Sequence, residues 1–450
     1  MTQVQTVLGP VDAAGLGRTL MHEHVFVLTA DVQQNYPQEW GDEDARVADA
    51  VRRLRQLPEH GVSTIVDVTV IGQGRNVPRV KRIAEQVPGL NVVVATGCYT
   101  FDDVPMFFWR RPPQAMTDFF VSDITEGIAG TGAKAGMLKC AVDERGLTAG
   151  VEQVLRCVAQ AHAQTNTPIT IHTHSASKHG PAILEVLKQE GADLSRVVLG
   201  HSGDSVHDPD YLERMADTGL TLGMDRFGID HFATFEPRSD LVVELCRRGL
   251  ADRMVLSHDT CCYIDWFAPG SLDDLKQWHY LHVSQDVLPY LKSHGVTDDQ
   301  IDAMLVRNPA RILAGLPPEA FERQRADRVG EVALGRARTR PVPLGGRVDQ
   351  AEQQFRGHHR IDVLAQVAVR DGLLDQRGGE LVERPAAGQR VALGGRVAVH
   401  AQQERDERLL CDEHGDAAAD QVLEPVDRSA GEELRAGRDR QQAVQGPAGG

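Results

Sequence analysis

The sequence predicts a (β/α)8 barrel, in which eight parallel strands alternate with helices and close into a cylinder. Three observations favour it: eight short β-rich runs lie between residues 18 and 315, they are apolar on both faces, and segments with helical spacing separate them. Eight such units in about 300 residues suit a barrel, whose usual length is about 250. An open doubly wound sheet is the alternative, but no Gly-x-Gly-x-x-Gly turn follows the first run.

The strands are predicted from runs rich in β-branched and apolar residues. Between them, apolar side chains recur at helical spacing in segments such as 45–57, 151–163 and 241–248. The predicted strands cover residues 19–27, 62–69, 91–100, 136–142, 169–174, 197–201, 222–227 and 254–258.

The last third of the chain has a different composition. After Met304 it contains no Lys, Met, Trp or Tyr, and small and charged residues dominate. Such a stretch buries too little apolar surface to offset the entropy lost on ordering. We therefore expect a catalytic barrel over residues 1–316 and a poorly ordered or artefactual extension over residues 317–450.

Charge and composition exclude several classes of partner. The formal net charge of -16 argues against nucleic acid and against an anionic membrane surface. The chain has no apolar run of membrane-spanning length, no secretory signal pattern at its start, and seven cysteines at spacings that indicate no disulfide framework. We expect a cytoplasmic protein that binds neither nucleic acid nor membrane.

Six polar side chains fall at the predicted C-terminal ends of strands, where barrel enzymes carry their chemistry. Two of them are histidines separated by one residue, so their side chains share a face of the strand. A hydrogen-bonded core position could explain any one of the six, but six at one end of a barrel indicate a metal centre. They are His22 and His24 in the first run, Lys139 in the fourth, His172 in the fifth, His201 in the sixth and Asp259 after the eighth.

These residue types predict a binuclear site. Imidazole and carboxylate groups bind Zn, Co, Fe or Mn. An ammonium beside these cations would be desolvated and repelled, whereas a neutral amine at Lys139 could react with carbon dioxide to form a carbamate that bridges two metals. Two metals about 3.5 to 4 Å apart can share one water and lower its pKa toward neutrality. Asp259 could bind one metal and pass the proton of this water to the leaving group.

The segments around these positions resemble the phosphotriesterase family of the amidohydrolase superfamily, and within it the phosphotriesterase-like lactonases. The similarity spans roughly residues 17–314 and rests on Gly-Arg-Thr-Leu-Met-His-Glu-His-Val-Phe, Ala-Gly-Met-Leu-Lys-Cys, Gly-His-Ser-Gly-Asp-Ser, Met-Asp-Arg-Phe-Gly and Leu-Ser-His-Asp-Thr-Cys-Cys. His174 also lies on the His172 face, but it matches a position that binds no metal in the family. The resemblance implies His22, His24 and Asp259 on the more buried metal, His172 and His201 on the more exposed one, and carboxylated Lys139 between the two.

The resemblance also implies two polar residues that meet the substrate. Tyr99 ends the third predicted strand, where lactonases of the family carry a tyrosine whose hydroxyl contacts the reacting centre. A simple aromatic cap on the barrel is the alternative. Arg226 matches a family residue at the mouth of the barrel, although an ion pair with Asp225 or Asp230 would also explain it.

An apolar channel is implied by the loop after the eighth strand. Cys262 and Trp266 begin this loop, which in the family lines a channel for an acyl chain. Packing is the alternative for Cys262, because buried cysteines usually serve as small apolar side chains. An apolar slot with one polar end suits an N-acyl homoserine lactone. Residues 267–278 differ most among relatives and leave the preferred chain length open.

A homodimer is the expected assembly. The run Val-Pro-Met-Phe-Phe-Trp at residues 104–109 has neither helical nor strand periodicity, and so many large apolar side chains in a loop indicate a buried interface. The family forms homodimers, and we assign this run to the dimer surface. A local lid is the alternative.

We expect a lactonase with two zinc ions per subunit, or with Co, Fe or Mn in their place. Its substrates would be N-acyl homoserine lactones, a quorum-quenching activity, and it would act weakly on organophosphate esters. A dedicated phosphotriesterase (aryldialkylphosphatase) would share every metal ligand and is the first alternative. A non-catalytic metal-binding barrel is the second. A deoxyribonuclease-type metallohydrolase is disfavoured, because it would bridge its metals with Glu and present a basic mouth.

Overall fold

The computed structural model describes residues 2–268 and 270–315, which lie in one compact unit. All eight predicted strands are confirmed, and most end slightly earlier than expected. Positive φ angles at His201 (60°) and Asp259 (54°) turn the chain out of the sheet at two of these ends. The strands are β3 (Arg18–Glu23), β5 (Val62–Asp67), β6 (Asn91–Gly97), β7 (Met137–Val142), β8 (Ile169–Thr173), β9 (Val197–Leu199), β10 (Thr221–Met224) and β11 (Met254–Leu256).

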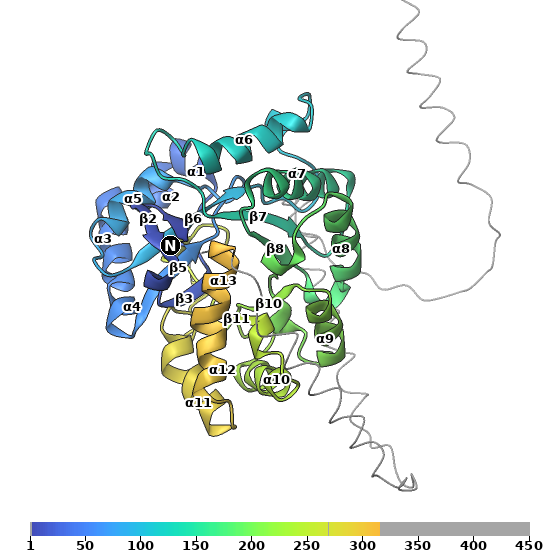
Figure 1. Cartoon of the computed structure of the whole chain (residues 1–450). Coiled ribbons are helices and arrows are strands. Elements are labelled where there is room, and N and C mark those ends of the chain that lie inside the picture. Colours follow the sequence, from blue (N-terminus) through green and yellow to red (C-terminus); the bar gives the residue numbers. More distant parts are fainter. Residues whose placement is uncertain (1, 269, 316–450) are drawn as a thin grey trace, which may run out of the picture. The chain divides into compact units, whose positions relative to one another are not determined.

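These strands form one parallel sheet in the order β11-β10-β9-β8-β7-β6-β5-β3. Its two end strands meet. The backbone N–H of His22 donates to Ser257 Oγ at 2.9 Å, and the N–H of Asp259 donates to the His22 carbonyl at 3.1 Å. The sheet therefore closes into the predicted barrel, with the helices around it (Figure 1).

Helices follow the strands as the apolar periodicity predicts. The segment 45–57 is divided between α3 and α4, 151–163 lies within α7, and 241–248 lies in the last part of α10 and its C-cap. The α-helices are α1 (Ala30–Asn35), α2 (Pro37–Trp40), α3 (Glu43–Leu54), α4 (Gln56–Glu59), α5 (Val77–Ala84), α6 (Gln114–Thr125), α7 (Ala149–Thr165), α8 (Gly180–Gln189), α9 (Pro209–Asp217), α10 (Phe235–Arg247), α11 (Leu288–Ser293), α12 (Asp298–Asp302) and α13 (Asn308–Ala314).

Two small sheets were not expected. The first predicted strand is broken after Glu23, and its last part, β4 (Phe26–Val27), pairs in parallel with β12 (Tyr263–Ile264) outside the barrel. An N-terminal antiparallel hairpin, β1 (Gln3–Thr6) and β2 (Gly9–Asp12), lies against the start of the barrel strands. There, Val7 N–H donates to the Val92 carbonyl at 2.8 Å. The hairpin thus covers the N-terminal end of the barrel.

The core has two parts. The larger cluster packs the outer face of the sheet against the helices. The smaller cluster draws its residues mainly from alternate positions of the strands, which point into the barrel. The barrel is therefore a packed core, and the polar groups gather at its C-terminal end. Strand residues of the smaller cluster include Met21, Val66, Val93, Met137, Val198 and Val255.

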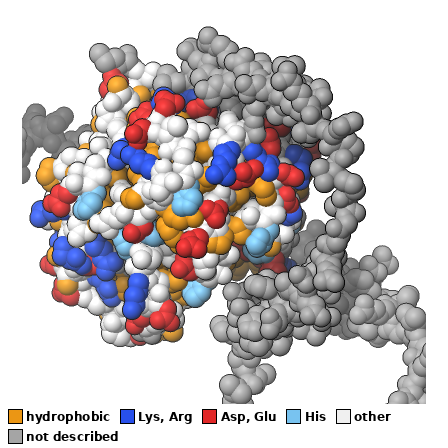
Figure 2. Space-filling model, turned by 90° about the horizontal axis from the view of Figure 1, so that it is seen from below, with side chains coloured by type: hydrophobic (Ala, Val, Ile, Leu, Met, Phe, Trp, Pro, Cys, Tyr) orange, Lys and Arg blue, Asp and Glu red, His pale blue; other side chains and the backbone are white. Residues whose placement is uncertain are grey.

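Within the residues that the structure describes, no helix is long and apolar enough to cross a membrane. Acidic and basic side chains are intermingled over the face shown in Figure 2. The predicted extension, residues 317–450, lies outside the described residues, and so the proposed domain boundary stays a prediction.

Candidate metal centre

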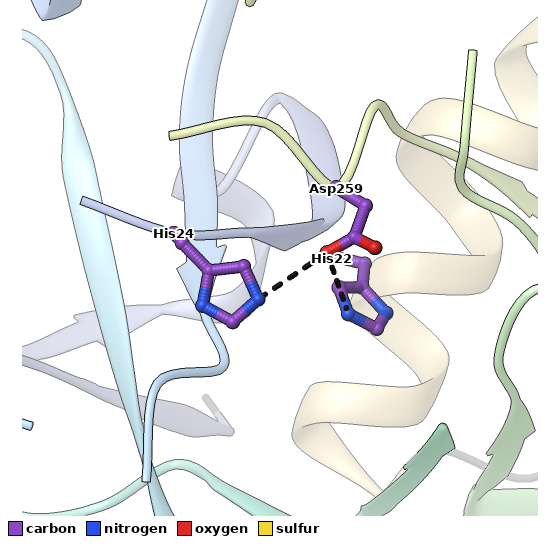
Figure 3. Close-up of side chains that lie close together, drawn as sticks. All are labelled: His22, His24 and Asp259. Carbon is purple, nitrogen blue, oxygen red and sulfur yellow. Dashed lines mark ion pairs between the residues drawn. The ribbon is translucent and has the colours of Figure 1, made fainter. Parts of the chain in front are cut away.

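The first group of predicted ligands joins the end of β3 to the turn after β11. The Nε2 atoms of His22 and His24 lie 3.4 and 3.3 Å from Asp259 Oδ1, and both rings point toward this carboxylate (Figure 3). Lys139 Nζ, from β7, lies 3.1 Å from His22 Nε2. Both histidines and the lysine are buried. The ligand atoms of His22, His24 and Asp259 are close enough to bind one cation together.

The second group lies beside the first. His172 at the end of β8 and His201 just after β9 bring Nδ1 and Nε2, respectively, within 2.8 Å of each other. His201 Nε2 is 3.9 Å from Asp259 Oδ2, and so Asp259 lies between the two groups. The structure thus brings all six predicted ligands together, and their role as ligands stays a prediction.

A single buried carboxylate orients one histidine of each group. Asp225 directly follows β10, and its Oδ1 lies 2.8 Å from His201 Nδ1 and also accepts the His201 backbone N–H at 2.8 Å. Its Oδ2 lies 3.1 Å from His22 Nδ1. Both rings therefore turn Nε2 toward the centre. Carboxylates that hold the outer nitrogen of a histidine in this way are usual around metal sites.

His24 and His172 are also oriented by carboxylates, one through a hydroxyl group and one directly. His24 Nδ1 lies 2.8 Å from Thr69 Oγ1, which donates to Asp67 Oδ1 at 2.5 Å. His172 Nε2 lies 2.5 Å from Asp143 Oδ2, which leaves Nδ1 to face the centre. Asp67, Asp143 and Asp225 were not predicted from the sequence to be members of the site. Their position at or just after the end of a strand was the available signal.

The electrostatics suit metal binding. Burial lowers the pKa of His172 to about 4, and burial together with Arg226 holds the pKa of His201 well below its ordinary value. Burial and Lys139 also lower the pKa of His22. These imidazoles are neutral at physiological pH, and only the neutral ring has a free lone pair on nitrogen for a cation.

Lys139 and Asp259 carry the charges that the centre needs. Burial lowers the pKa of Lys139 to about 8, against the attraction of Asp259, so that part of the amine is neutral near pH 7 and able to form a carbamate. Burial opposes ionisation of Asp259, but His22 and His24 hold its pKa well below the usual range. The donor set therefore fits two divalent cations.

Tyr99 and Trp266 lie together at the mouth of the barrel. The Tyr99 hydroxyl is 3.2 Å from His172 Nδ1, and its ring centroid is 5.7 Å from that of Trp266. The Trp266 side chain is 40% exposed. Phe101, which our sequence analysis did not single out, packs 4.9 Å from Tyr99 and 5.4 Å from His172 between ring centroids. An aromatic wall, formed by Tyr99, Phe101 and Trp266, therefore borders the centre.

Arg226 bridges two carboxylates. Its Nη1 lies 2.9 Å from Asp204 Oδ2, and its Nε lies 3.3 Å from Asp259 Oδ2. The alternative explanation, an ion pair with Asp225 or Asp230, names the wrong partners: the guanidinium pairs with Asp204 and Asp259, whereas Asp225 faces His22 and His201. The ring of Phe232 lies 4.3 Å from the same guanidinium.

Cys262 and His174 lie away from this wall. Cys262 is 7% exposed and belongs to the larger core cluster, with Sγ 3.3 Å from the Tyr280 hydroxyl. This environment matches the packing alternative, and its role in substrate binding stays a prediction. His174 Nδ1 lies 2.7 Å from Ser177 Oγ in the turn after β8, which is consistent with a position that binds no metal.

Comparisons with known proteins identify the family. The family model described as "Phosphotriesterase family" matches residues 2–313. A "Phosphotriesterase homology protein" of Mycobacterium tuberculosis is 54% identical over 333 residues, which are 72% of this chain and 99% of that protein. An aryldialkylphosphatase of Saccharolobus solfataricus is 35% identical over 307 residues, 68% of this chain and 97% of that protein.

A solved structure agrees with the sequence comparisons. The structure of the phosphotriesterase from Mycobacterium tuberculosis matches with a TM-score of 0.68 at 54% identity, over 69% of this chain and 98% of that one. The family model's match, residues 2–313, includes every residue of the candidate centre. The chain therefore belongs to the phosphotriesterase family and is a hydrolase of that family.

Proposed function

We propose that this hydrolase opens lactones, with N-acyl homoserine lactones as its main substrates and weak activity on organophosphate esters. The observation that supports this substrate class is the aromatic wall beside the centre. An acyl chain can lie along these rings while the polar lactone ring meets the charged groups. Quorum quenching would be the consequence of such an activity.

The metal centre is part of this proposal. His22, His24 and Asp259 would hold one divalent ion, and His172 and His201 would hold the other, with the Lys139 carbamate between them. Zinc suits the nitrogen and oxygen donors, and Co, Fe or Mn are the alternatives. When bound, two such ions supply a Lewis acid and a water that ionises near neutral pH.

The protein's own residues would move the proton and hold the developing charge. Hydrolysis adds one water across the acyl C–O bond of the lactone ring, so the proton of that water must reach the departing alkoxide. Asp259 lies between the two donor groups and is ionised, which suits it to carry this proton. Burial raises the pKa of Tyr99 well above its usual value, so its hydroxyl stays protonated and can donate to the carbonyl oxygen.

The deciding experiment compares two substrates in one preparation of known metal content. We expect kcat/KM on a medium-chain N-acyl homoserine lactone to exceed that on a neutral aryl phosphotriester by at least about tenfold, or about 1.4 kcal/mol in transition-state binding. The reverse preference would refute the lactonase assignment.

A dedicated phosphotriesterase is the second candidate. Its support is the 35% identical relative that is named an aryldialkylphosphatase. Such an enzyme would need the same donors and a different pocket, and so the substrate comparison separates it from a lactonase. A non-catalytic barrel would turn over neither substrate.

We also propose a homodimer formed through an aromatic patch, made of Met106, Phe107, Trp109 and Phe119. These side chains are between 45% and 75% exposed, and the rings of Phe107 and Phe119 are stacked at 5.6 Å. Exposed apolar groups of this size in one place are typical of protein interfaces. A cytoplasmic location is proposed as well, supported by the six free cysteines among the described residues.

A further inference from the structure

Asp259 has an unusual backbone. Its φ angle is 54°, in the left-handed region, which residues with a Cβ adopt far less often than glycine. This conformation places the carboxylate between the two groups of predicted ligands. Contacts around residues 258–260 must hold it there.

Glu23 makes these contacts from β3. Its Oε1 accepts the backbone N–H of His258 at 3.0 Å, and its Oε2 accepts the N–H of Thr260 at 3.0 Å. The backbone N–H groups of the two residues next to Asp259 in the sequence are therefore both bound by one carboxylate. Glu23 and His258 are 0% exposed and Thr260 is 1% exposed, so water does not compete for these bonds.

The side chain of His258 adds a third bond. Val283 N–H donates to His258 Nε2 at 2.8 Å, which requires that nitrogen to carry a lone pair. In the neutral ring the proton is therefore on Nδ1, which donates to Glu23 Oε1 at 2.7 Å. Glu23 thus accepts three hydrogen bonds from the chain segment that carries Asp259.

We propose that Glu23 is a positioning residue that fixes the Asp259 carboxylate relative to His22 and His24. At the end of β3, where its pairing with β5 shifts register, His22 and His24 turn their imidazoles toward Asp259, and the Glu23 carboxylate between them meets the turn after β11. This one short segment therefore contributes two predicted ligands and also holds the turn that carries the third. This inference rests on the proposed metal centre and adds a residue to it that binds neither metal nor substrate.

A Glu23→Gln variant tests the inference with almost no change in shape. The amide group of Gln would face at least one N–H group, and a donor that faces a donor loses its hydrogen bond. The segment with Asp259 would then be free to leave the left-handed conformation. We expect metal affinity and kcat to fall 10- to 100-fold, roughly the effect of losing an outer partner of a metal site, while KM changes little.

The measurements separate positioning from a merely structural role. Cobalt is loaded into the wild type and the variant, and its visible absorption spectrum and dissociation constant are measured together with kcat and KM. Asp123→Asn is the matched control, because Asp123 is a carboxylate that accepts bonds from Thr96 Oγ1 at 2.6 Å and Arg75 Nη1 at 2.8 Å outside the centre. It should lower the melting temperature and leave the cobalt spectrum unchanged.

If Glu23→Gln binds cobalt with the wild-type spectrum and affinity and retains kcat, the inference is wrong. A wild type that binds no cobalt would instead overturn the proposed function. If Glu23→Gln does not fold, Glu23→Asp decides, because the shorter side chain keeps the charge but withdraws its oxygens from the His258 and Thr260 N–H groups, from which they accept bonds at 3.0 Å. This variant should shift the cobalt spectrum in the same way, and an unchanged spectrum would also refute the inference.

Discussion

Lys139 has the most demanding environment of any single residue in the site. It is 1% exposed, its amine lies against the His22 imidazole, and burial lowers its pKa to about 8. We expect Lys139→Ala to abolish turnover, because the proposed carbamate between the two donor groups could not form. Activity on a lactone, the metal content of each preparation and binding of an unreactive lactone analogue are the measurements. Lys188→Ala, at an exposed lysine of α8, is the control and should keep wild-type activity.

Two outcomes would contradict this role. If Lys139→Ala retained both metals and a substantial fraction of turnover, the lysine would be a packed core residue. If neither wild type nor variant hydrolysed a lactone or a phosphotriester, while both bound the same ligands, the barrel would be a binding protein.

The predicted metal ligands could be identified from the sequence, but the carboxylates that orient them could not. His22 and His201 could be placed together because each lies close to the end of a strand, and parallel strands of a barrel end at the same face. Lys139 lies in the middle of β7, and its long side chain brings Nζ to 3.1 Å from His22 Nε2. Asp225 orients His22 and His201 because their rings lie beside it across neighbouring strands. Strand order alone does not predict the distances between these side chains. The ion-pair partners of Arg226 were predicted wrongly for the same reason, because the direction of its guanidinium depends on the shape of the turn after β10.

Among the structural elements, the loop after β11 carries a residue, Trp266, that we propose contacts the acyl chain of the substrate. Trp266 extends from this loop to within 5.7 Å of Tyr99, between ring centroids, and is 40% exposed. We expect Trp266→Ala to lower kcat/KM on a medium-chain acyl homoserine lactone about tenfold, because an acyl chain loses an apolar surface worth about 1.4 kcal/mol. Hydrolysis of γ-butyrolactone, which has no acyl chain, is the internal control and should be unaffected. Equal losses on both lactones would place Trp266 outside the chain-binding surface.

The segment between β6 and α6, together with Phe119 of α6, carries the proposed dimer surface. Phe107→Asp puts a charge into the aromatic patch, and burying an unpaired charge at an interface costs several kcal/mol. We expect the variant to be monomeric in analytical ultracentrifugation at concentrations where the wild type is dimeric. Leu8→Asp, at an apolar residue that is 52% exposed in the N-terminal hairpin, should leave the association unchanged. A variant that dimerises like the wild type would refute this surface.

The strands were easier to predict from the sequence than the residues at which they end. Apolar runs identified all eight strands, because burial on both faces leaves a long signal in the sequence. The break after Glu23 was not visible, since Val25, Phe26 and Val27 continue the apolar pattern although β4 pairs outside the barrel. The N-terminal hairpin was also missed, because its strands are short and only partly buried.

For the molecule as a whole, the buried histidines of the candidate centre lower the stability of the folded state at acidic pH, and a bound metal would offset this loss. The folded barrel buries several imidazoles in their neutral form, whereas the unfolded chain exposes the same imidazoles to water. Cations that bind only the folded state stabilise it by mass action. The stability of the metal-free protein should therefore depend on pH in a way that the metal-loaded protein masks.

We expect the metal-free protein to lose stability as the pH falls from about 6.5 to about 4. Burial lowers the pKa of His172 to about 4 and that of His258 to about 3, whereas the unfolded chain binds these protons near pH 6.5. The unfolded state therefore holds more protons across this interval, and the free energy of unfolding falls, by about 3 kcal/mol for His172 alone. Urea denaturation of chelator-treated protein at several pH values measures this change in the free energy of unfolding.

A variant isolates the contribution of one ring. In His172→Gln the decline with falling pH should be shallower, because the residue that takes up a proton on unfolding is gone. His60→Gln, at an exposed histidine of the α4 C-cap, should follow the wild-type curve. Stability that stays constant or rises between about pH 6.5 and about pH 4 would mean that the buried rings are already protonated in the folded protein, and the neutral donor set required for binding cations would then be absent.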